Sequence, residues 1–470
     1  MLPLVEFPQI VQHYAPWFES VFSAEALVQF QRYLSGLIIS ENKTVDGINR
    51  LFVIESRNQS SLNRLLTASP FSKAKLNEQR LALLNSLVGT RVKPKGVLSV
   101  DDTLLTHYGR HFDQIAFLYD PVDDRYTWAH NLVNLHYSDD QTDYPAYFKL
   151  WEPADLDKIE QGLQAADIRL RESKFTLKES DPKKWRQYLL GVWRRNQGKP
   201  EVAALYQSKL LMARQLLCRW VDKHPQLKLP VTFDNWYTQP AFCRFLDQEL
   251  ELPYVGTLAG SDQVKLQKGP LTLEAFAEQL KEEHLKAIKA GSKPVFHKIG
   301  ITYKGKKETY YSYCRTHRIH NLGRQRLVIN FSEPDLSDSP RFYNSNRLYW
   351  QSVGITRIRR HRWPVEVYHE EGKEEGLDKY QVRDFEAVSR HIVLVAVAYS
   401  LLRAVPHDEA LLHKLQRQLE MDLEAGSAPF WRRATQAQSL WALACFISAG
   451  LAQGLSLRAL MDPLLAAVCY

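Results

Sequence analysis

Acidic residues at three places in this sequence could act together on a phosphate ester. Asp101 and Asp102 follow the apolar run GVLSV, Asp234 closes the run KLPVTF, and Glu366 lies in VEVYHEEGK. Two-metal phosphoryl transfer uses carboxylates that converge on cations about 4 Å apart, and oxygen ligands suit Mg²⁺ or Mn²⁺. We therefore expect two such ions on Asp101, Asp234 and Glu366, with Asp102 as the alternative to Asp101.

The elements around these residues decide whether they can meet. We expect Asp101 or Asp102 to end one strand and Asp234 another, because ligands gather at strand ends in open sheets. On a helix, Glu366, Glu370 and Lys373 share one stripe, so Lys373 can reach a phosphate beside Glu366. Taken singly, each Asp is more often a turn or capping residue and Glu366 a solvated one. The hypothesis rests on their joint placement.

The hydrophobic pattern changes along the chain and indicates five regions. Apolar residues recur at helical spacing near the N-terminus, whereas GVLSVDDT, HFDQIAFLYDP and RYTWAHNLVNLHY are typical of three successive strands. Helical patterns at 154–173 and 201–223, a strand ending at Asp234 and the strand LPYVGTLA then predict an α/β core with a mixed sheet. The expected regions are a helical domain at 1–94, the first part of the core at 95–259, a β-rich insertion at 260–348, the rest of the core at 349–404 and a helical region at 405–470.

The charge distribution indicates a polyanionic partner. The chain has a net charge of +8, and between Lys286 and Arg326 there are eleven Lys and Arg against the single acid Glu308. Tyr303, Tyr310, Tyr311 and Tyr313 lie among these cations, which suits contact with a duplex backbone and some stacking. The alternative is a solvated hairpin. Expected DNA contacts in this segment are Lys304, Lys306, Lys307, Arg315 and Arg318.

Composition also excludes some classes of protein. The N-terminus has no basic region followed by an apolar one, and the longest apolar run, 392–402, is short of a bilayer span. The five cysteines, Cys218, Cys243, Cys314, Cys445 and Cys469, form no CxxC pair. We expect a cytoplasmic protein, associated with the nucleoid, without a membrane partner, a zinc site or a disulfide framework.

Three motifs in order resemble the DDE transposases of bacterial insertion sequences that carry a β-rich insertion. VLSVDDTLLTHYG at 97–109 resembles the family's strand ending in Asp-x-Thr, which favours Asp101, and VTFDNWYT at 231–238 resembles its second strand. The most specific is RHRWPVEVYHEEGKEEGLDKYQVR at 360–383, which is similar to the Tyr-(2)-Arg-(3)-Glu-(6)-Lys signature through Arg362, Glu366 and Lys373. The signature's Tyr is Arg359 here. NKTVDGINRLF and SSLNRLLTASPFS, at 42–52 and 60–72, are similar to the group's helical DNA-binding region.

This resemblance implies an RNase H-like core, cleavage at transposon ends and strand transfer into target DNA, carried out by a homodimer. Arg362 and Lys373, with Arg359 and Arg360, would contact DNA, and an aromatic residue would receive a flipped base. Trp236, Trp350 and Trp363 are candidates, although each is more often a core residue. The 405–470 region is either a dimerisation region or a cap on the core. Two alternatives stay open, an RNase H-like nuclease without strand transfer and an inactive, domesticated DNA-binding protein.

Overall fold

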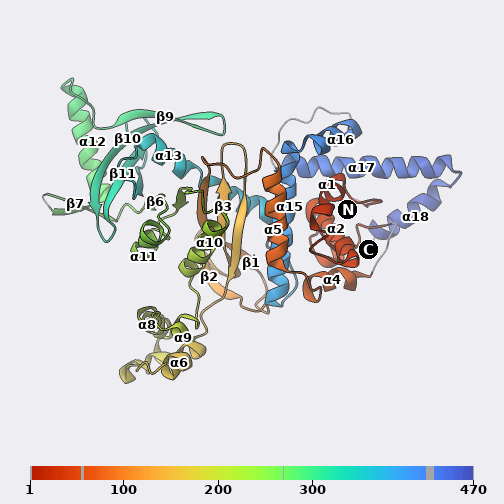
Figure 1. Ribbon diagram of the computed structural model, residues 1–470, viewed down its shortest axis with the longest axis horizontal. Coiled ribbons are helices and arrows are strands. Elements are labelled where there is room, and N and C mark those ends of the chain that lie inside the picture. Colours follow the sequence, from red (N-terminus) through yellow and green to blue (C-terminus); the bar gives the residue numbers. More distant parts are fainter. Residues whose placement is uncertain (1–2, 54–57, 268, 420–427, 469–470) are drawn as a thin grey trace.

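The computed structural model describes residues 3–53, 58–267, 269–419 and 428–468. The centre of the fold is one mixed sheet of twelve strands within these residues (Figure 1). Ten of the strands follow one another in the order β2-β3-β1-β5-β6-β12-β11-β10-β7-β8. In addition β4 pairs with β3, and β9 pairs with β10. The expected α/β class with a mixed sheet is present.

The first half of the sheet contains one strand more than the hydrophobic pattern predicts. Its members are β1 (Val97–His107), β2 (Ala116–Asp120), β3 (Arg125–Ser138), β4 (Asp143–Trp151), β5 (Val231–Phe233) and β6 (Tyr254–Leu258). The prediction of three strands before the first helix is wrong because it omits β4. Pro145 breaks the pattern of that strand and lies where the β3–β4 register shifts, at Leu135/His136. Proline is tolerated at such irregular positions.

Helices from the middle and the C-terminal part of the chain pack against the strands β1, β3 and β4. Helix α10 (Lys209–Lys223) packs on β3 and β4, while α14 (Trp363–Glu374) contacts β1, β3 and β4, and α15 (Phe385–Ala404) packs on β4. The segment Phe385–His407 is the one described helix long and apolar enough to cross a membrane, but 83% of its apolar window is buried within the protein. This burial is that of a core helix.

The N-terminal helices share a hydrophobic core with the sheet. They are α1 (Gln9–Tyr14), a 3-10 turn (Ala15–Phe18), α2 (Ala24–Ile39), α3 (Val45–Asn49), α4 (Gln59–Thr67) and α5 (Lys73–Ser86). Ser23, Thr44, Asn58 and Ser72 cap four of them by accepting a backbone N–H bond. Buried residues of these helices belong to the same cluster as those of β1, β3 and α15, so the helical expectation for 1–94 holds, without a separate core.

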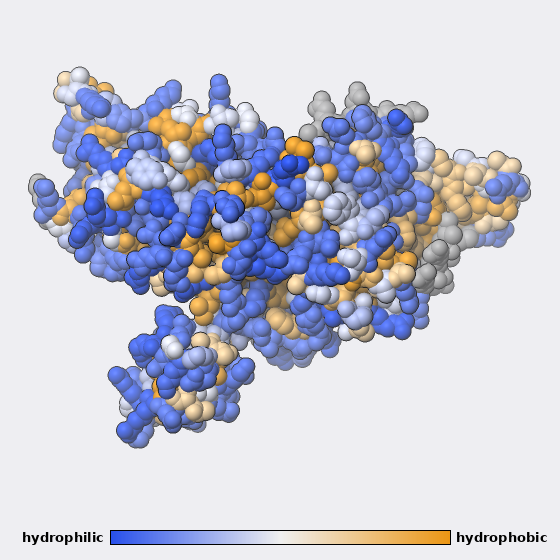
Figure 2. Space-filling view, viewed as in Figure 1, coloured by the Kyte–Doolittle hydropathy of each residue, from blue (hydrophilic) through white to orange (hydrophobic). Residues whose placement is uncertain are grey.

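A small helical lobe between β4 and α10 was not foreseen. It consists of α6 (Leu156–Ala165), a 3-10 turn (Glu172–Lys174), α7 (Leu177–Ser180), α8 (Pro182–Arg195) and α9 (Pro200–Ala203), and it projects from the body (Figures 1 and 2). Trp185, Leu189 and Trp193 form part of its own core. The predicted helices at 154–173 and 201–223 correspond to α6 and α10, but α8 lies between them.

The β-rich insertion extends the central sheet. It contains β7 (Gln263–Leu266), β8 (Gly269–Thr272), α12 (Leu273–Lys289), β9 (His297–Tyr303), β10 (Lys306–Ile319), β11 (Gly323–Phe331) and β12 (Arg341–Ser345). Antiparallel pairing of β12 with β6 continues the ladder from the core. The β-rich segment predicted at 260–348 thus continues the sheet of the core, while α12 and these strands enclose a hydrophobic cluster of their own.

The C-terminal part is helical but interrupted. The helical spacing of the sequence from 357 onward predicts one continuous helical stretch, but α13 (Ser352–Arg360) ends before α14 begins, with a break at His361 and Arg362. After α15 come a 3-10 turn (Val405–His407), α16 (Glu409–Leu419), α17 (Ala428–Ala452) and α18 (Leu457–Val468). α17 and α18 project from the body, and this end is rich in apolar side chains (Figures 1 and 2).

Candidate active site

The first acidic pair lies within β1 and not at its end. β1 continues to His107, which corrects the expectation that Asp101 and Asp102 close the strand. Successive side chains of a strand point to opposite faces, so the two carboxylates face different helices. Asp101 contacts Arg362 at the start of α14, whereas Asp102 contacts Lys209 at the start of α10.

Asp234 directly follows β5, as expected. β5 runs parallel to β1, with Val100 paired to Phe233, and one further step along this register leads to Asp101 and Asp234. Neighbouring strands are about 4.8 Å apart, so the two backbones are close at this point. The Asp234 carboxylate accepts the backbone N–H of Tyr237 at 3.2 Å, which fixes the turn after β5.

Glu366 lies in the first turn of α14. This helix begins at Trp363, and Pro364 occupies its first turn, where proline leaves no helical hydrogen bond unmade. Pro364 therefore starts the helix and does not kink it. Arg362 is the residue immediately before the helix, four positions before Glu366.

One guanidinium joins the carboxylates of β1 and α14. Arg362 donates to Asp101 Oδ2 at 2.5 Å through one terminal nitrogen and to Glu366 Oε1 through the other. The two carboxylates are therefore within the span of a single arginine fork. Residues 261 positions apart are brought together in this way.

The electrostatic environment of the acids departs from that of surface carboxylates. Burial raises the pKa of Asp101 to about 7, Arg362 opposes this rise, and the charges of Asp234 and Asp102 add to it. Burial also raises the pKa of Asp234, against the backbone N–H of Tyr237 and the charge of Arg362. Like charges clustered in a partly desolvated site are typical of functional sites.

A cleft of about 870 Å³ contains all of these acids. Its lining includes Asp101, Asp102, Asp234 and Glu366. Glu370 and Lys373 of α14 line it too, so the stripe expected on that helix faces the cleft. The cleft thus combines carboxylates with cations that could hold phosphate oxygens.

Lys209 is a residue of the cleft that the sequence did not reveal. Its ammonium lies 2.9 Å from Asp102 Oδ2 and 4.5 Å from the centre of the Trp236 ring. Tyr237 Oη and Asn131 Nδ2 also donate to the Asp102 carboxylate, at 2.9 and 2.6 Å. Asp102 therefore has three partners of its own on the α10 side. No motif marks Lys209, since it lies 107 positions from Asp102.

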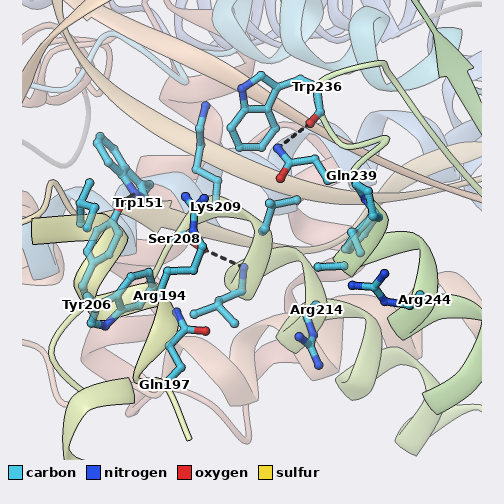
Figure 3. A pocket seen from close by; sticks show the side chains of 17 residues that line it. Trp151, Arg194, Gln197, Tyr206, Ser208, Lys209, Arg214, Trp236, Gln239 and Arg244 are labelled. Carbon is cyan, nitrogen blue, oxygen red and sulfur yellow. Dashed lines mark hydrogen bonds between the residues drawn. The ribbon is translucent and has the colours of Figure 1, made fainter. Parts of the chain in front are cut away.

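A second cavity of about 540 Å³ adjoins the cleft through Lys209 and Trp236, which line both (Figure 3). Its walls come from the helical lobe, α10 and the short helix α11 (Pro240–Arg244). The lining contains several aromatic rings and the cations Lys209, Arg194, Arg214 and Arg244, and none of its 17 residues is acidic. Such a cavity suits a planar group with a negative charge nearby.

The three candidate tryptophans differ in exposure. Trp236 and Trp363 are 43% and 49% exposed, and Trp363 lines a smaller cavity with Arg359 and Glu366. Trp350 packs against the core between β6 and α13. Exposure beside the carboxylates thus favours Trp236 and Trp363, whereas Trp350 is a packing residue.

Several expected DNA contacts are engaged within the protein. Lys304 reaches the buried Asp143 at 2.6 Å, and Arg360 pairs with Glu308 at 3.0 Å. Arg359 is half-buried and donates to Thr257 Oγ1 at 2.8 Å, and burial lowers its pKa to about 10. In this structure these three side chains are thus engaged within the protein, and their contact with DNA stays a prediction.

The other cations of the insertion are at the surface. Lys306, Lys307, Arg315 and Arg318 are exposed along β10. Tyr303, Tyr310 and Tyr313 are buried, so the expected stacking by these three rings is wrong, and only Tyr311 of the four is half-exposed. Contact of this surface with DNA would therefore rest on its exposed cations, with Tyr311 as the one ring of the four accessible for stacking.

The side chains of this site are of the type that binds a hard divalent cation. Asp101, Asp234 and Glu366 supply carboxylate oxygens, the ligands that Mg²⁺ prefers. Among the described residues, no three His, Cys, Asp or Glu side chains converge as a formed metal centre, and here the Arg362 guanidinium stands between Asp101 and Glu366. A cation held by these acids would take over the neutralising contact of that guanidinium.

Comparison with known proteins gives one family. The model of the DDE superfamily endonucleases matches residues 17–272, which is more than half of the chain and includes Asp101 and Asp234. Glu366 lies beyond the matched segment, and no curated protein matches the sequence. The four cysteines that the structure describes are free, and Cys469 lies outside the described residues. With a mixed sheet that carries two clustered aspartates and a helix that adds Glu366, the chain belongs to the DDE superfamily of endonucleases.

Proposed function

We propose that this protein is a transposase of the cut-and-paste type, which cleaves DNA at transposon ends and joins the cut ends to target DNA. The observation that carries the proposal is the approach of β1, β5 and α14, which brings three acids distant in sequence into one cleft with cations. The DDE superfamily implies a DNA substrate and endonuclease activity. Strand transfer is the further step that we add.

The carboxylates of Asp101, Asp234 and Glu366 would hold two Mg²⁺ or Mn²⁺ ions, which supply an activated water and a neutralised leaving oxygen. DDE superfamily nucleases generally use divalent ions of this kind. We assign the role to Asp101 because it shares the α14 face with Glu366, while Asp102 already holds Lys209. Asp102 would then position Lys209 against the DNA backbone.

Arg362 and Lys373 would bind phosphate oxygens next to the acids. The Arg362 guanidinium, which bridges Asp101 and Glu366, has the fork geometry that would match the oxygens of a scissile phosphate. Lys373 lies about two turns beyond Glu366 on the same wall of the cleft. The cavity behind Trp236 would accept a base displaced from the duplex, with its phosphates near Arg194 or Arg244.

The first test is cleavage of DNA that carries the flanking ends of the element, in Mg²⁺. We expect Asp101→Asn and Asp234→Asn each to slow cleavage by at least ~10³-fold, because each removes a ligand charge from the reacting centre. Asp167→Asn is the matched control, since Asp167 is exposed in the helical lobe at a positive φ that asparagine also adopts. Binding of the same DNA in Ca²⁺ should be within a few fold of wild type. Cleavage that survives Asp234→Asn would remove Asp234 from the site.

The second test separates a transposase from a nuclease. Pre-cut ends with a free 3′-OH are incubated with a circular target, and joined products are counted. We expect joining in wild type and none with Asp234→Asn, because both steps use one set of acids. Cleavage without joining would favour a nuclease that lacks strand transfer. Binding without cleavage would favour an inactive DNA-binding protein.

A further inference from the structure

Three aromatic rings on the β2–β3 hairpin lie open to solvent. Phe117 and Tyr119 of β2 are 55% and 49% exposed, and Tyr126 of β3 is 56% exposed. Tyr119 lies opposite Tyr126 in the strand register, and Phe117 lies opposite Trp128. The rings of Phe117 and Tyr126 stack with centres 5.5 Å apart, and those of Tyr119 and Tyr126 meet edge to face at 5.5 Å. We name Phe117, Tyr119 and Tyr126 the aromatic ladder.

The ladder is an ordered surface. The hydroxyl of Tyr119 donates to Asp124 Oδ1 at 2.5 Å, and the backbone N–H of Val122 donates to Asp120 at 3.0 Å, which fixes the turn between the strands. Single exposed apolar side chains are ordinary, but a contiguous group marks a surface that binds something. These rings face away from the core, so packing does not account for them.

The same hairpin borders the carboxylate cleft. Leu118, Tyr119 and Val122 line the cleft that contains Asp101 and Glu366. The ladder therefore begins where the cleft ends, at the outer edge of the sheet, since β2 is the terminal strand of its row. A DNA strand that passes Asp101 and leaves on this side meets the ladder next.

Charge decides which part of DNA the ladder can contact. From Ala116 to Tyr126 there are three acids, Asp120, Asp123 and Asp124, against Arg125 alone, and Arg125 pairs with Asp123 at 2.7 Å. Phosphates are repelled by such a turn. Bases are not, because their faces stack on aromatic rings whatever the sequence. The cationic side chains that could contact the DNA backbone, including Lys209 and Lys373, line other walls of the cleft.

We propose that the aromatic ladder stacks on unpaired bases of the DNA strand that leaves the carboxylate cleft, and so holds the duplex open beside the cleavage site. This rests on the proposed DNA-cleaving function and adds a site for single-stranded bases to it. The ladder is separate from the cavity behind Trp236, which none of its residues lines.

The test compares two DNAs of one sequence, a fully paired duplex and a fork whose unpaired arm carries 2-aminopurine, with full-length protein in Ca²⁺ to prevent cleavage. We expect wild type to bind the fork at least ~10-fold more tightly and to quench the 2-aminopurine fluorescence by stacking. The double variant Phe117→Ser, Tyr126→Ser should lose both effects and keep its affinity for the paired duplex. Tyr349→Ser is the control, because Tyr349 is also exposed but lines neither the cleft nor the cavity.

Each of the remaining results of this experiment shows which of the two proposals fails. A double variant that keeps the fork preference and the quenching overturns the ladder proposal alone. So does a double variant that changes the sedimenting mass of the protein and leaves fork binding unaltered, since the ladder would then contact a protein. A wild type that binds neither DNA overturns the proposed function as well, and the cleavage assay identifies that case independently.

Discussion

At the scale of single residues, one arginine balances a group of acids. Asp101 is buried beside Asp234 and Asp102, and Arg362 is the cation that opposes the resulting rise in its pKa. The same guanidinium contacts Glu366. Arg362 therefore holds the acids of β1 and α14 close together. This arrangement affects stability as well as catalysis.

Removal of the buried charge should stabilise the metal-free protein at neutral pH. The pKa of Asp101 is about 7 in the folded chain against an ordinary value of 3.8. Between these values the folded state keeps a proton that the unfolded state has released, so the free energy of unfolding of wild type falls as pH rises from about 4 to 7. Asp101→Asn cannot titrate and escapes this fall.

The measurement is thermal unfolding in EDTA at pH 5 and pH 8. We expect Asp101→Asn to gain about 1–3 kcal/mol relative to wild type between the two pH values, while it loses DNA cleavage. Asp167→Asn, with its exposed side chain, should show no such gain. An equal difference between Asp101→Asn and wild type at both pH values would mean that Asp101 does not titrate in this range.

At the scale of elements, local pattern predicted the strands that carry the acids and missed those that lack a local signal. β5 follows from the apolar run before Asp234, whereas the start of α14 at Trp363 was not predicted, because helical spacing continues across the turn at His361 and Arg362. β4 was missed because Pro145 disguises it, and α8 because its lobe buries its own tryptophans away from the main core. That β12 pairs with β6 is a tertiary fact, which no alternation within either strand encodes.

The role of Lys304 near the site likewise could not be predicted from the sequence. The sequence shows a cation among cations, but Lys304 lies 161 positions from its partner Asp143. Asp143 is buried, and Arg403 of α15 lies 3.5 Å from it and 3.0 Å from Glu371 of α14. The β9–β10 hairpin is thereby tied to the helix that carries Glu366. The role of Lys304 is thus set by long-range packing.

Lys304→Met and Lys306→Met should affect different properties, the first the stability of the fold and the second the binding of DNA. Loss of the Lys304 ammonium leaves a buried carboxylate with fewer partners, so we expect the free energy of unfolding to fall by about 1–3 kcal/mol and the salt dependence of DNA binding to stay unchanged. Lys306 is exposed on the same hairpin. Its variant should keep wild-type stability and reduce the slope of log affinity against log salt by about 1. Melting curves and a salt titration check both, and equal slopes for the two variants would contradict the assignment.

At the scale of the whole molecule, a single sheet connects the carboxylate cleft to the basic insertion. The strand pairing runs without a break from β2 beside the cleft to β10 with its exposed cations. DNA bound at both places, as we propose, would be positioned by one continuous sheet. The helical lobe and the α17–α18 projection lie outside this sheet (Figure 1). Both are therefore free to contact other molecules without disturbing the strands.

The α17–α18 projection presents apolar side chains that this chain does not cover. Leu440, Trp441 and Leu451 of α17 and Leu457 of α18 are exposed, and the projecting end is visibly apolar (Figure 2). We propose that a second copy covers them, since a surface that contacts its own copy about a two-fold axis makes a closed dimer. Cleavage of two transposon ends would suit a pair of carboxylate clefts.

We expect wild type to sediment as two chains and Trp441→Glu as one, because a buried charge in an apolar interface costs several kcal/mol. The substituted side chain is at the surface of a single chain, so the melting temperature of the monomer should be preserved. Val88→Glu is the control, since Val88 is exposed and belongs to neither α17 nor α18. Sedimentation velocity at micromolar concentration, with and without end DNA, checks the result. A wild type that remains a single chain under both conditions would show that the projection serves another partner.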